Sequence, residues 1–531
     1  MLSDMLYDGA SMARHHREAN PWELLGSLVA IPLRDSSEGT VVFLQHLGYW
    51  AHVGLILGFM NILPYTKQFH EITGIPNVFF QPLRPVGRLP TIDDIEERVE
   101  RGETLGIRRI DHFGAKAFLD FFSCTECGRC SNQCPAANTG KRLSPKFLTV
   151  DLREFGYKHQ AALIARNRQQ DGDEQNPPPH RADLAGNVVA PEVLWACTTC
   201  AACEQECPVF ISYIDKIVGM RRHLVMERGE FPEQLQNLFQ GLERAGNPYS
   251  YPNEQRAEWA AGLGVPLRAD RPDAEWLLWV GCAPSFDDRA RKIARATAEL
   301  LLAAGVDFAI LGPEEQCNGD PARRAGNEYL FQTLAKANIE TLSRYNVRKI
   351  LTMCPHCFNT LKNEYPDFGG RYQVVHHSEL LAQLVQQGRL RPQHPVAAKV
   401  AYHDACYLGR HNQVYEPPRE LLARIPGLEL VEAEQRRDRA MCCGAGGAQM
   451  WKEEEAGQMR VNHARTNQLV AALSGNGRPR AIASACPFCM TMLRDGLADQ
   501  GHEGVETLDI AEILHRAVVG STARSPAGSP A

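Results

Sequence analysis

The 531-residue sequence lacks the features of several common protein classes. Its N-terminus lacks the order of charged, apolar and small residues that marks a secretory signal peptide. It has no long basic stripe and a formal net charge of only −6, so we do not expect nucleic acid as a partner. No G-x-G-x-x-G motif stands between an expected strand and helix, so we expect no nicotinamide site, and no flavin on this chain.

Charged residues are also absent from residues 39–66, and residues 41–63 are apolar and long enough to cross a hydrocarbon core of about 30 Å. After a polar segment at 1–38, this pattern predicts a transmembrane helix within residues 39–70. Acidic residues precede the helix and basic residues follow it, so the positive-inside rule places the rest of the chain in the cytoplasm. We therefore expect a cell-membrane protein in contact with lipid, with its other domains on the cytoplasmic side.

Cysteine, in contrast, is abundant, with 17 residues. Disulfide frameworks suit short secreted chains, whereas these cysteines fall into short-spaced sets that recur along a long chain. The pattern predicts metal binding in a reducing compartment.

The run C-x2-C-x2-C-x3-C-P occurs twice after an expected linker at 71–115, within a domain that we expect at 116–265. Three cysteines of such a run can bind three corners of a cubane, and the fourth ligates the other cluster. Zinc sites are the alternative, but they usually use two short C-x2-C arms. We therefore predict two [4Fe–4S] clusters in a helical dicluster domain of the type seen in succinate dehydrogenase iron–sulfur subunits. One cluster would use Cys124, Cys127, Cys130 and Cys207, and the other Cys134, Cys197, Cys200 and Cys203.

From about residue 276, short apolar runs such as WLLWV, KILTM, KVAYH and AIASA alternate with helical stretches, which predicts α/β units with a parallel sheet. The cysteines reveal a duplication, with copies expected at 270–390 and 395–518 before a disordered tail at 519–531. In both copies a lone cysteine and a C-P-x-C pair follow an expected strand, where the end of a parallel sheet commonly opens a ligand crevice. The first copy contains Cys282, Cys317, Cys354 and Cys357, and the second contains Cys406, Cys442, Cys443, Cys486 and Cys489.

These cysteines resemble the cysteine-rich domain with the CCG motif, found in heterodisulfide reductases and in iron–sulfur subunits of glycolate, lactate and glycerol-3-phosphate oxidising systems. In heterodisulfide reductases, five such cysteines hold a noncubane [4Fe–4S] cluster. The resemblance implies a cluster and the catalytic cysteines at the second copy, with a redox dithiol or zinc site as the alternative. The first copy has Asn318 in place of the doublet's second cysteine, so its four thiolates hold either a cubane or no cluster.

Several polar residues near these cysteines could serve protons or substrate, or could be hydrogen-bonded structural residues near turns. His403 and Arg410 are the stronger candidates because they flank Cys406. The other candidates are His376, His377, Asp404 and His411.

His52 and His70 lie 18 residues apart, which is five whole turns and about 27 Å along one face of a straight helix. This spacing predicts ligands for two haems stacked across a bilayer, with interfacial histidines on a simple anchor as the alternative. Pro64 lies between the two histidines and can kink or end the helix, which would break this spacing. One helix cannot enclose a haem, so the opposite ligands need another helix. Residues 46–80 resemble the last helix of the cytochrome b domain of respiratory nitrate reductases.

A cytochrome b domain fused to a dicluster and CCG module occurs in the membrane iron–sulfur oxidoreductases proposed to pass electrons from electron-transfer flavoprotein to menaquinone. The chain resembles this family from about residue 39 to its end, including CNGDPARRAGNEYLFQ and YHDACYLGRHN. The resemblance implies electron-transfer flavoprotein as the soluble donor and quinone as the acceptor. The earlier membrane helices are missing, so we expect a separate cytochrome b subunit or a longer gene product.

The leading hypothesis is therefore an iron–sulfur oxidoreductase that relays electrons from a soluble donor to quinone through [4Fe–4S] clusters and b-type haem. One alternative is a disulfide reductase of the heterodisulfide reductase type that uses membrane-derived electrons. Another is a passive wiring subunit of a glycolate, lactate or glycerol-3-phosphate dehydrogenase complex. Direction does not follow from the residues, because cluster potentials depend on hydrogen bonds and burial.

Overall fold

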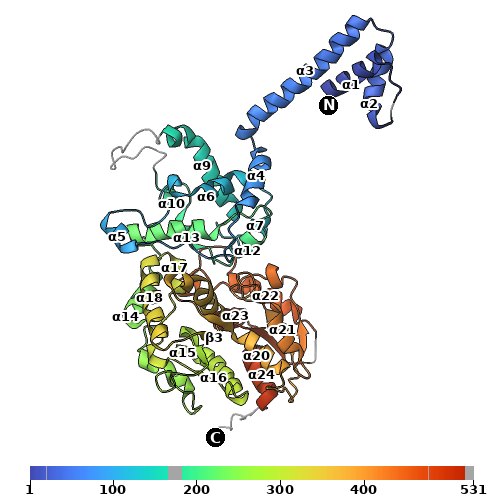
Figure 1. The fold of residues 1–531 in the computed structure, drawn as a ribbon. Coiled ribbons are helices and arrows are strands. Elements are labelled where there is room, and N and C mark those ends of the chain that lie inside the picture. The colour runs from blue at the N-terminus through green and yellow to red at the C-terminus, as the bar shows by residue number, and fades with distance from the viewer. Residues whose placement is uncertain (20, 166–181, 476–477, 521–531) are drawn as a thin grey trace. The chain divides into compact units, whose positions relative to one another are not determined.

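The computed structural model describes residues 1–19, 21–165, 182–475 and 478–520 (Figure 1). The chain divides into two compact units, residues 1–76 and 77–531. The tail expected at 519–531 lies outside the described residues from residue 521 onward.

The first unit begins with the helices α1 (Leu2–Arg14), α2 (Leu24–Leu33) and α3 (Glu38–Ile62). The polar N-terminal segment thus forms two helices, and α1 packs against both α2 and α3. Gly48 of α3 permits this packing, because a Cβ atom there would lie 2.6 Å from the backbone nitrogen of Tyr7. Ser37 caps α3 by accepting a hydrogen bond from the backbone N–H of Thr40.

Helix α3 and the turn that follows it are, by length and composition, the one element of the described residues that could cross a membrane. Its apolar side chains face outward, with Trp50 65% exposed and Leu55 68% exposed. The expected continuation to residue 70 is corrected, because α3 ends at Ile62 and a 3-10 turn containing Pro64 follows. Proline lacks the backbone N–H that an α-helix needs, and it disfavours the helical backbone conformation at the preceding residue. His70 therefore lies on a separate helix, α4 (Phe69–Phe79), and the straight-helix spacing from His52 does not apply.

The second unit begins with helices around the two cysteine runs. Several of them have only four or five residues, because closely spaced cysteines, prolines and left-handed residues leave little chain for regular structure there, whereas the helix at Pro145–Ala165 has 21 residues. The helices are α5 (Ile95–Glu100), α6 (Ala115–Ser123), α7 (Arg129–Asn132), α8 (Pro135–Asn138), α9 (Pro145–Ala165), α10 (Leu184–Asn187), α11 (Pro191–Trp195), α12 (Ala202–Gln205), α13 (Ile214–Arg222) and α14 (Gln234–Ala245).

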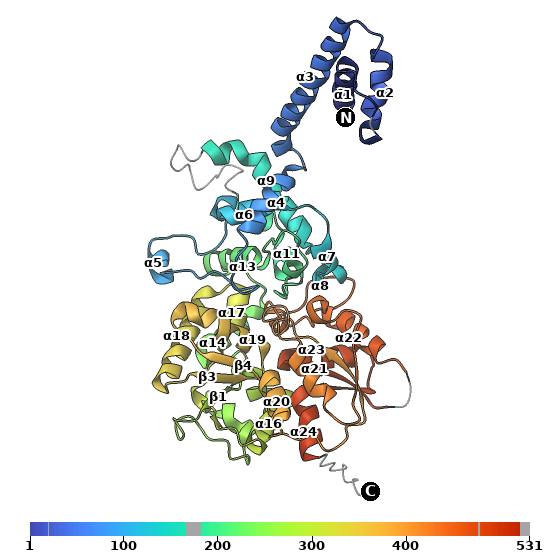
Figure 2. The same ribbon diagram turned by 45° about the vertical axis from the view of Figure 1, so that its right-hand side comes forward.

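Two four-stranded parallel sheets follow, and they confirm the α/β architecture expected from the sequence (Figure 2). The strand orders are β2-β1-β3-β4 and β6-β5-β7-β8, so both copies share one topology. Each central strand pair is almost fully buried, as its continuous apolar sequence requires. The strands are β1 (Trp276–Trp279), β2 (Phe308–Ala309), β3 (Lys349–Thr352), β4 (Gln373–His376), β5 (Lys399–His403), β6 (Glu429–Val431), β7 (Arg480–Ser484) and β8 (Val505–Asp509).

Helices cover the two sheets and join the copies to each other. Helix α16 of the first copy packs against α24 of the second, and Arg289 forms a bidentate pair with Glu512. The helices are α15 (Cys282–Phe286), α16 (Asp288–Ala303), α17 (Asp320–Ala325), α18 (Glu328–Arg344), α19 (Pro355–Asn359), α20 (His377–Gln386), α21 (Glu416–Ala423), α22 (Val461–Ala472), α23 (Pro487–Asp499) and α24 (Ile510–Val519).

The fully buried side chain of Arg221, on α13, joins the helical region to both α/β copies. Its guanidinium donates hydrogen bonds to the carbonyl oxygens of Leu194 and Cys197 in the helical region. It also donates to the carbonyl oxygen of Arg324 in the first copy and to that of Gly447 in the second. One cation thus satisfies carbonyl groups from three parts of the chain.

The glycines after the CCG doublet let two loops approach closely. A Cβ atom at Gly447 would lie 2.2 Å from the carbonyl oxygen of Cys197, and one at Gly446 would lie 2.4 Å from that of Thr198. Gly447 also adopts a positive φ of 66°. The G-A-G-G sequence therefore serves the contact between the second copy and the second cysteine run.

We predict that Gly447→Ala destabilises the protein more than Gly369→Ala. Both positions have positive φ, so an alanine at either incurs about 1–2 kcal/mol of left-handed strain. Only at residue 447 would the new Cβ also meet backbone, since nothing lies within 4 Å of a Cβ at residue 369. Anaerobic thermal denaturation of the two variants should show the larger loss in Tm for Gly447→Ala. Equal losses would mean that the close approach does not constrain the fold.

Candidate metal centres

The first cysteine run contributes three sulfurs to one small cavity, and the second run contributes the fourth. Cys124 follows α6, Cys127 lies in an exposed loop and Cys130 lies on α7. Left-handed backbone at Glu126 turns this loop between the cysteines. Cys207 lines the same cavity, although it belongs to the second run.

The last cysteine of the first run, Cys134, lies beside the second run instead. It precedes α8 and is 6% exposed. Burial raises the pKa of Cys134, and the nearby thiols of Cys200 and Cys197 raise it further. Burial also raises the pKa of Cys203, and the nearby thiol of Cys134 contributes to this rise. The structure therefore brings together two sets of four cysteines, each with one member from the other run.

The second set touches the second cysteine-rich copy directly. Cys200, Cys406 and Cys442 pack in one buried cluster with Tyr407. A hydrogen bond with Cys442, followed by burial, raises the pKa of Cys200 well above its usual range. The Tyr407 hydroxyl lies 2.8 Å from Oγ1 of Thr199, which joins the same two loops.

The five cysteines of the second copy form a continuous group at the carboxyl ends of its strands. Cys443 Sγ lies 3.3 Å from Cys489 Sγ. The Gly444 N–H donates to Cys442 Sγ at 3.3 Å, and the Cys489 N–H donates to Cys486 Sγ at the start of α23. Hydrogen bonds with the Cys442 and Cys489 thiols lower the pKa of Cys443 well below its usual value.

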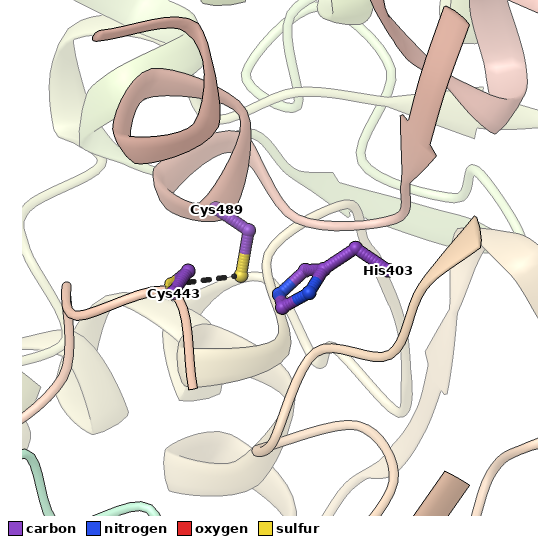
Figure 3. A group of neighbouring side chains, drawn as sticks. All are labelled: His403, Cys443 and Cys489. Carbon is purple, nitrogen blue, oxygen red and sulfur yellow. Dashed lines mark hydrogen bonds between the residues drawn. The ribbon is translucent and has the colours of Figure 1, made fainter. Parts of the chain in front are cut away.

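His403, the last residue of β5, faces two of these cysteines (Figure 3). One ring nitrogen and the sulfurs of Cys443 and Cys489 lie within 4.8 Å of one another. Arg465 Nε donates a hydrogen bond of 3.0 Å to His403 Nδ1. Burial, and then the charge of Arg465, hold the pKa of His403 well below its ordinary value.

The four cysteines of the first copy line one enclosed cavity of about 30 Å³, together with Asn318 and Trp451. Arg256 Nη2 donates to Cys282 Sγ at 3.2 Å. A hydrogen bond with Cys317, and to a smaller extent the charge of Arg256, lower the pKa of Cys282. Asn318 Oδ1 accepts from the backbone N–H of Asp320, so this side chain holds a turn beside the cysteines.

The two copies bring their C-P-x-C pairs together. Burial raises the pKa of Cys486, and the next contribution is a hydrogen bond with Cys354 of the first copy. Beside this junction, the Tyr407 ring stacks at 4.0 Å on both His356 and His411. The sulfurs therefore continue from the first copy through the second copy to the second dicluster set.

The other residues that the sequence indicated contact neighbouring side chains or backbone groups. His376 caps α20 by accepting from the Ser378 N–H, and His377 pairs with Asp509 at 2.9 Å. The remaining contacts are Asp404 with Arg419, Arg410 with the carbonyl oxygen of Cys200, His411 with that of Thr199, His70 with that of Lys67, and His52 with Asp4 at 3.9 Å.

The donor set fits iron–sulfur clusters, because buried thiols converge and buried cations face them. Arg221, Arg410 and Arg465 are at most 2% exposed, and none forms an ion pair with a carboxylate among the described residues. Burial lowers the pKa of Arg221 and Arg465, and nearby cysteines act against this shift. The pKa of Arg410 is raised, because nearby cysteines outweigh the effect of its burial. A buried cation needs an anion or full hydrogen bonding, and metal-bound thiolates would supply the anions. Sequence reasoning missed Arg221, Arg256 and Arg465, since no motif marks them.

Comparison with known proteins agrees with this arrangement. The cysteine-rich domain family matches residues 276–362 and 400–494, and the 4Fe-4S dicluster domain family matches residues 123–211. The probable iron–sulfur-binding oxidoreductase FadF of Bacillus subtilis is 40% identical, over 98% of this chain and 77% of its own. The EtfAB:quinone oxidoreductase of Syntrophomonas wolfei is 39% identical, over 95% and 72%.

A third relative, a probable membrane-anchored ferredoxin of Chromohalobacter salexigens, is 39% identical over 80% of this chain and 63% of its own. Both halves of the cysteine pattern thus match known families, and the FadF match covers almost the whole chain. The chain belongs to the family of iron–sulfur oxidoreductases in which a [4Fe–4S] dicluster domain precedes two CCG-type cysteine-rich domains.

Proposed function

We propose that this chain relays electrons between a soluble electron-transfer flavoprotein and the quinone pool at the cell membrane. The observation that carries the proposal is the succession of cysteine sets, each beside the next. The two dicluster sets exchange Cys134 and Cys207, and the second set contacts the second cysteine-rich copy through Cys200 and Cys442. A succession of this kind suits transfer between centres.

The grouping of the cysteines indicates which cluster each set would hold. The dicluster sets would hold two cubanes, the five cysteines of the second copy a noncubane [4Fe–4S] cluster, and the four of the first copy a further cluster. When bound, such clusters supply one-electron transfer. The chain's own residues bury most of the cysteines, although Cys127 is exposed, and place buried cations beside them, including Arg256 and Arg410.

The partners are supported by two relatives, one named for EtfAB and quinone and one for membrane anchoring. Helix α3 supports attachment to a membrane, because its apolar side chains are exposed over a length that could cross the hydrocarbon core. Lys67, Arg84 and Arg88 follow that helix and favour the cytoplasmic side for the clusters.

A b-type haem would connect this chain to the quinone through His52 on α3. Because α3 ends before His70, the second histidine does not share its helix. A further haem ligand would come from a helix of a cytochrome b subunit. A histidine in a membrane helix is a functional candidate, which supports this assignment.

We predict that Cys443→Ala removes one electron paramagnetic resonance signal and about four irons per chain, because the doublet sulfur joins Cys442 to Cys489. The cubane signals should persist, since Cys443 belongs to neither dicluster set. Anaerobic iron analysis and spectroscopy of membrane-purified protein would measure both quantities. Unchanged iron and spectra would overturn the cluster assignment at the second copy.

Cys317→Ala provides the matched comparison in the first copy. If that copy holds a cluster, this variant loses a different signal while the Cys443-dependent signal persists. If iron stays constant in Cys317→Ala, the first copy is a structural half without a cluster.

We predict that His52→Ala abolishes a b-type haem spectrum in membranes that contain the partner subunit, because an axial nitrogen is lost. His46→Ala is the matched control, since His46 is an exposed histidine on the same helix. Reduced-minus-oxidised absorption spectra of the two variants would be compared at equal protein content. A haem spectrum that survives in His52→Ala would make α3 an anchor without a ligand role.

We predict that reduced electron-transfer flavoprotein is reoxidised by membranes containing this protein and quinone, and that Cys443→Ala slows the rate at least tenfold. The measurement is flavin absorbance under anaerobic conditions. If the membranes do not reoxidise the flavoprotein but do reduce a low-molecular-weight disulfide, the disulfide reductase alternative would be favoured. Activity only in the presence of a hydroxy-acid dehydrogenase would favour the wiring-subunit alternative.

A further inference from the structure

One ring nitrogen of His403 has a hydrogen-bond partner, and the other has none among the described residues. Nδ1 receives the hydrogen bond from Arg465 Nε at 3.0 Å. Nε2 is buried and has no hydrogen-bond partner among the described residues. The side chain is 1% exposed, so bulk water is not a substitute partner.

The hydrogen bond from Arg465 determines where the proton of the ring resides. A guanidinium nitrogen can only donate, so Nδ1 must be the acceptor and cannot carry a proton. A neutral imidazole with a bare Nδ1 carries its proton on Nε2. Nε2 is therefore a donor that lacks an acceptor.

The orientation of the ring identifies the acceptor. Figure 3 shows the tip of the ring directed toward the sulfurs of Cys443 and Cys489. A ring nitrogen and both sulfur atoms lie within 4.8 Å of one another. The buried donor thus faces the two cysteines that join the CCG doublet to the C-P-x-C pair.

This arrangement argues against histidine ligation of the metal. A metal-binding nitrogen must be unprotonated, and the opposite nitrogen of a ligating histidine almost always donates to a carbonyl or carboxylate. Here the opposite nitrogen accepts from a cation, which is the reverse pattern. His403, Cys443 and Cys489 therefore resemble a metal site only in the distances between their atoms.

We propose that His403 donates its Nε2–H to a sulfur of the centre held by Cys443 and Cys489, and so raises the reduction potential of that centre. The inference rests on the proposed ligand role of these two cysteines. Hydrogen bonds to cluster sulfurs are among the factors that set the potential, because they stabilise the added negative charge of the reduced state. His403 is a tuning residue, held in one tautomer by Arg465.

The test compares His403→Phe, which keeps a planar ring but lacks a donor, with His403→Gln, which retains an N–H donor. His463→Gln is the control, because His463 pairs with Asp499 at the surface and lies outside the site. We expect His403→Phe to disfavour reduction of the Cys443-dependent centre about tenfold, which is about 59 mV for one electron. His403→Gln should recover part of this shift, and His463→Gln should show none.

Iron content and the g values of the signal should be unchanged in His403→Phe, because no ligand is lost. A changed g tensor or lost iron would mean that His403 is a ligand, and an unchanged potential would mean that it does not tune the centre. If Cys443→Ala itself leaves the signal intact, the ligand assignment fails and not the tuning role alone.

Pulsed electron paramagnetic resonance of the unmodified protein gives a measurement independent of folding of the variants. With ¹⁵N-labelled histidine, a second-sphere donor should give a weak nitrogen coupling to the Cys443-dependent signal. A strong coupling, as expected for a directly bound nitrogen, would overturn the proposal. An absence of any histidine coupling would overturn it as well.

Discussion

The close contact between the loop after the CCG doublet and the loop of the second cysteine run is the constraint on which the arrangement of sites depends. Gly446 and Gly447 allow backbone to meet backbone there, since a side chain at either position would overlap a carbonyl oxygen. Arg221 also joins the two loops by donating hydrogen bonds to the carbonyl oxygens of Cys197 and Gly447. Without this contact, Cys200 would not lie beside Cys442, and the dicluster sets would be separated from the cysteine-rich copies.

Buried cations are the second common feature of the sites. Burying a guanidinium without an anion is costly, and removing one partner of a buried pair usually destabilises strongly. Arg410 donates to the carbonyl oxygens of Cys200, Asp438 and Ala440, yet has no carboxylate partner in the described parts of the chain. The thiols of Cys200, Cys406 and Cys442 raise its pKa. Charge balance is therefore best where these cysteines are thiolates, the state that metal binding requires.

The spacing of cysteines carried most of the information available from the sequence, because ligand spacing is a local property of the chain. It predicted the duplication, while the alternation of apolar runs with helical stretches predicted the parallel sheets, and the two equivalent strand orders confirm both. Contacts between distant segments, such as those of Arg465 with His403 or Cys354 with Cys486, depend on packing that no local pattern records. The end of α3 before His70 illustrates the reverse case, since Pro64 was visible but its effect depended on whether the helix would kink or stop.

The difference between the two copies follows from where each lies in the succession of sulfurs. The second copy has neighbours on both sides, through Cys442 toward the dicluster and through Cys486 toward the first copy. The first copy lies at the end, where Asn318 replaces a cysteine and instead fixes the turn before α17. Asp320 on that turn also pairs with His356, which stacks on Tyr407. Asn318 thus stabilises the junction between the copies, while the four remaining sulfurs equal the number of ligands that a cubane needs.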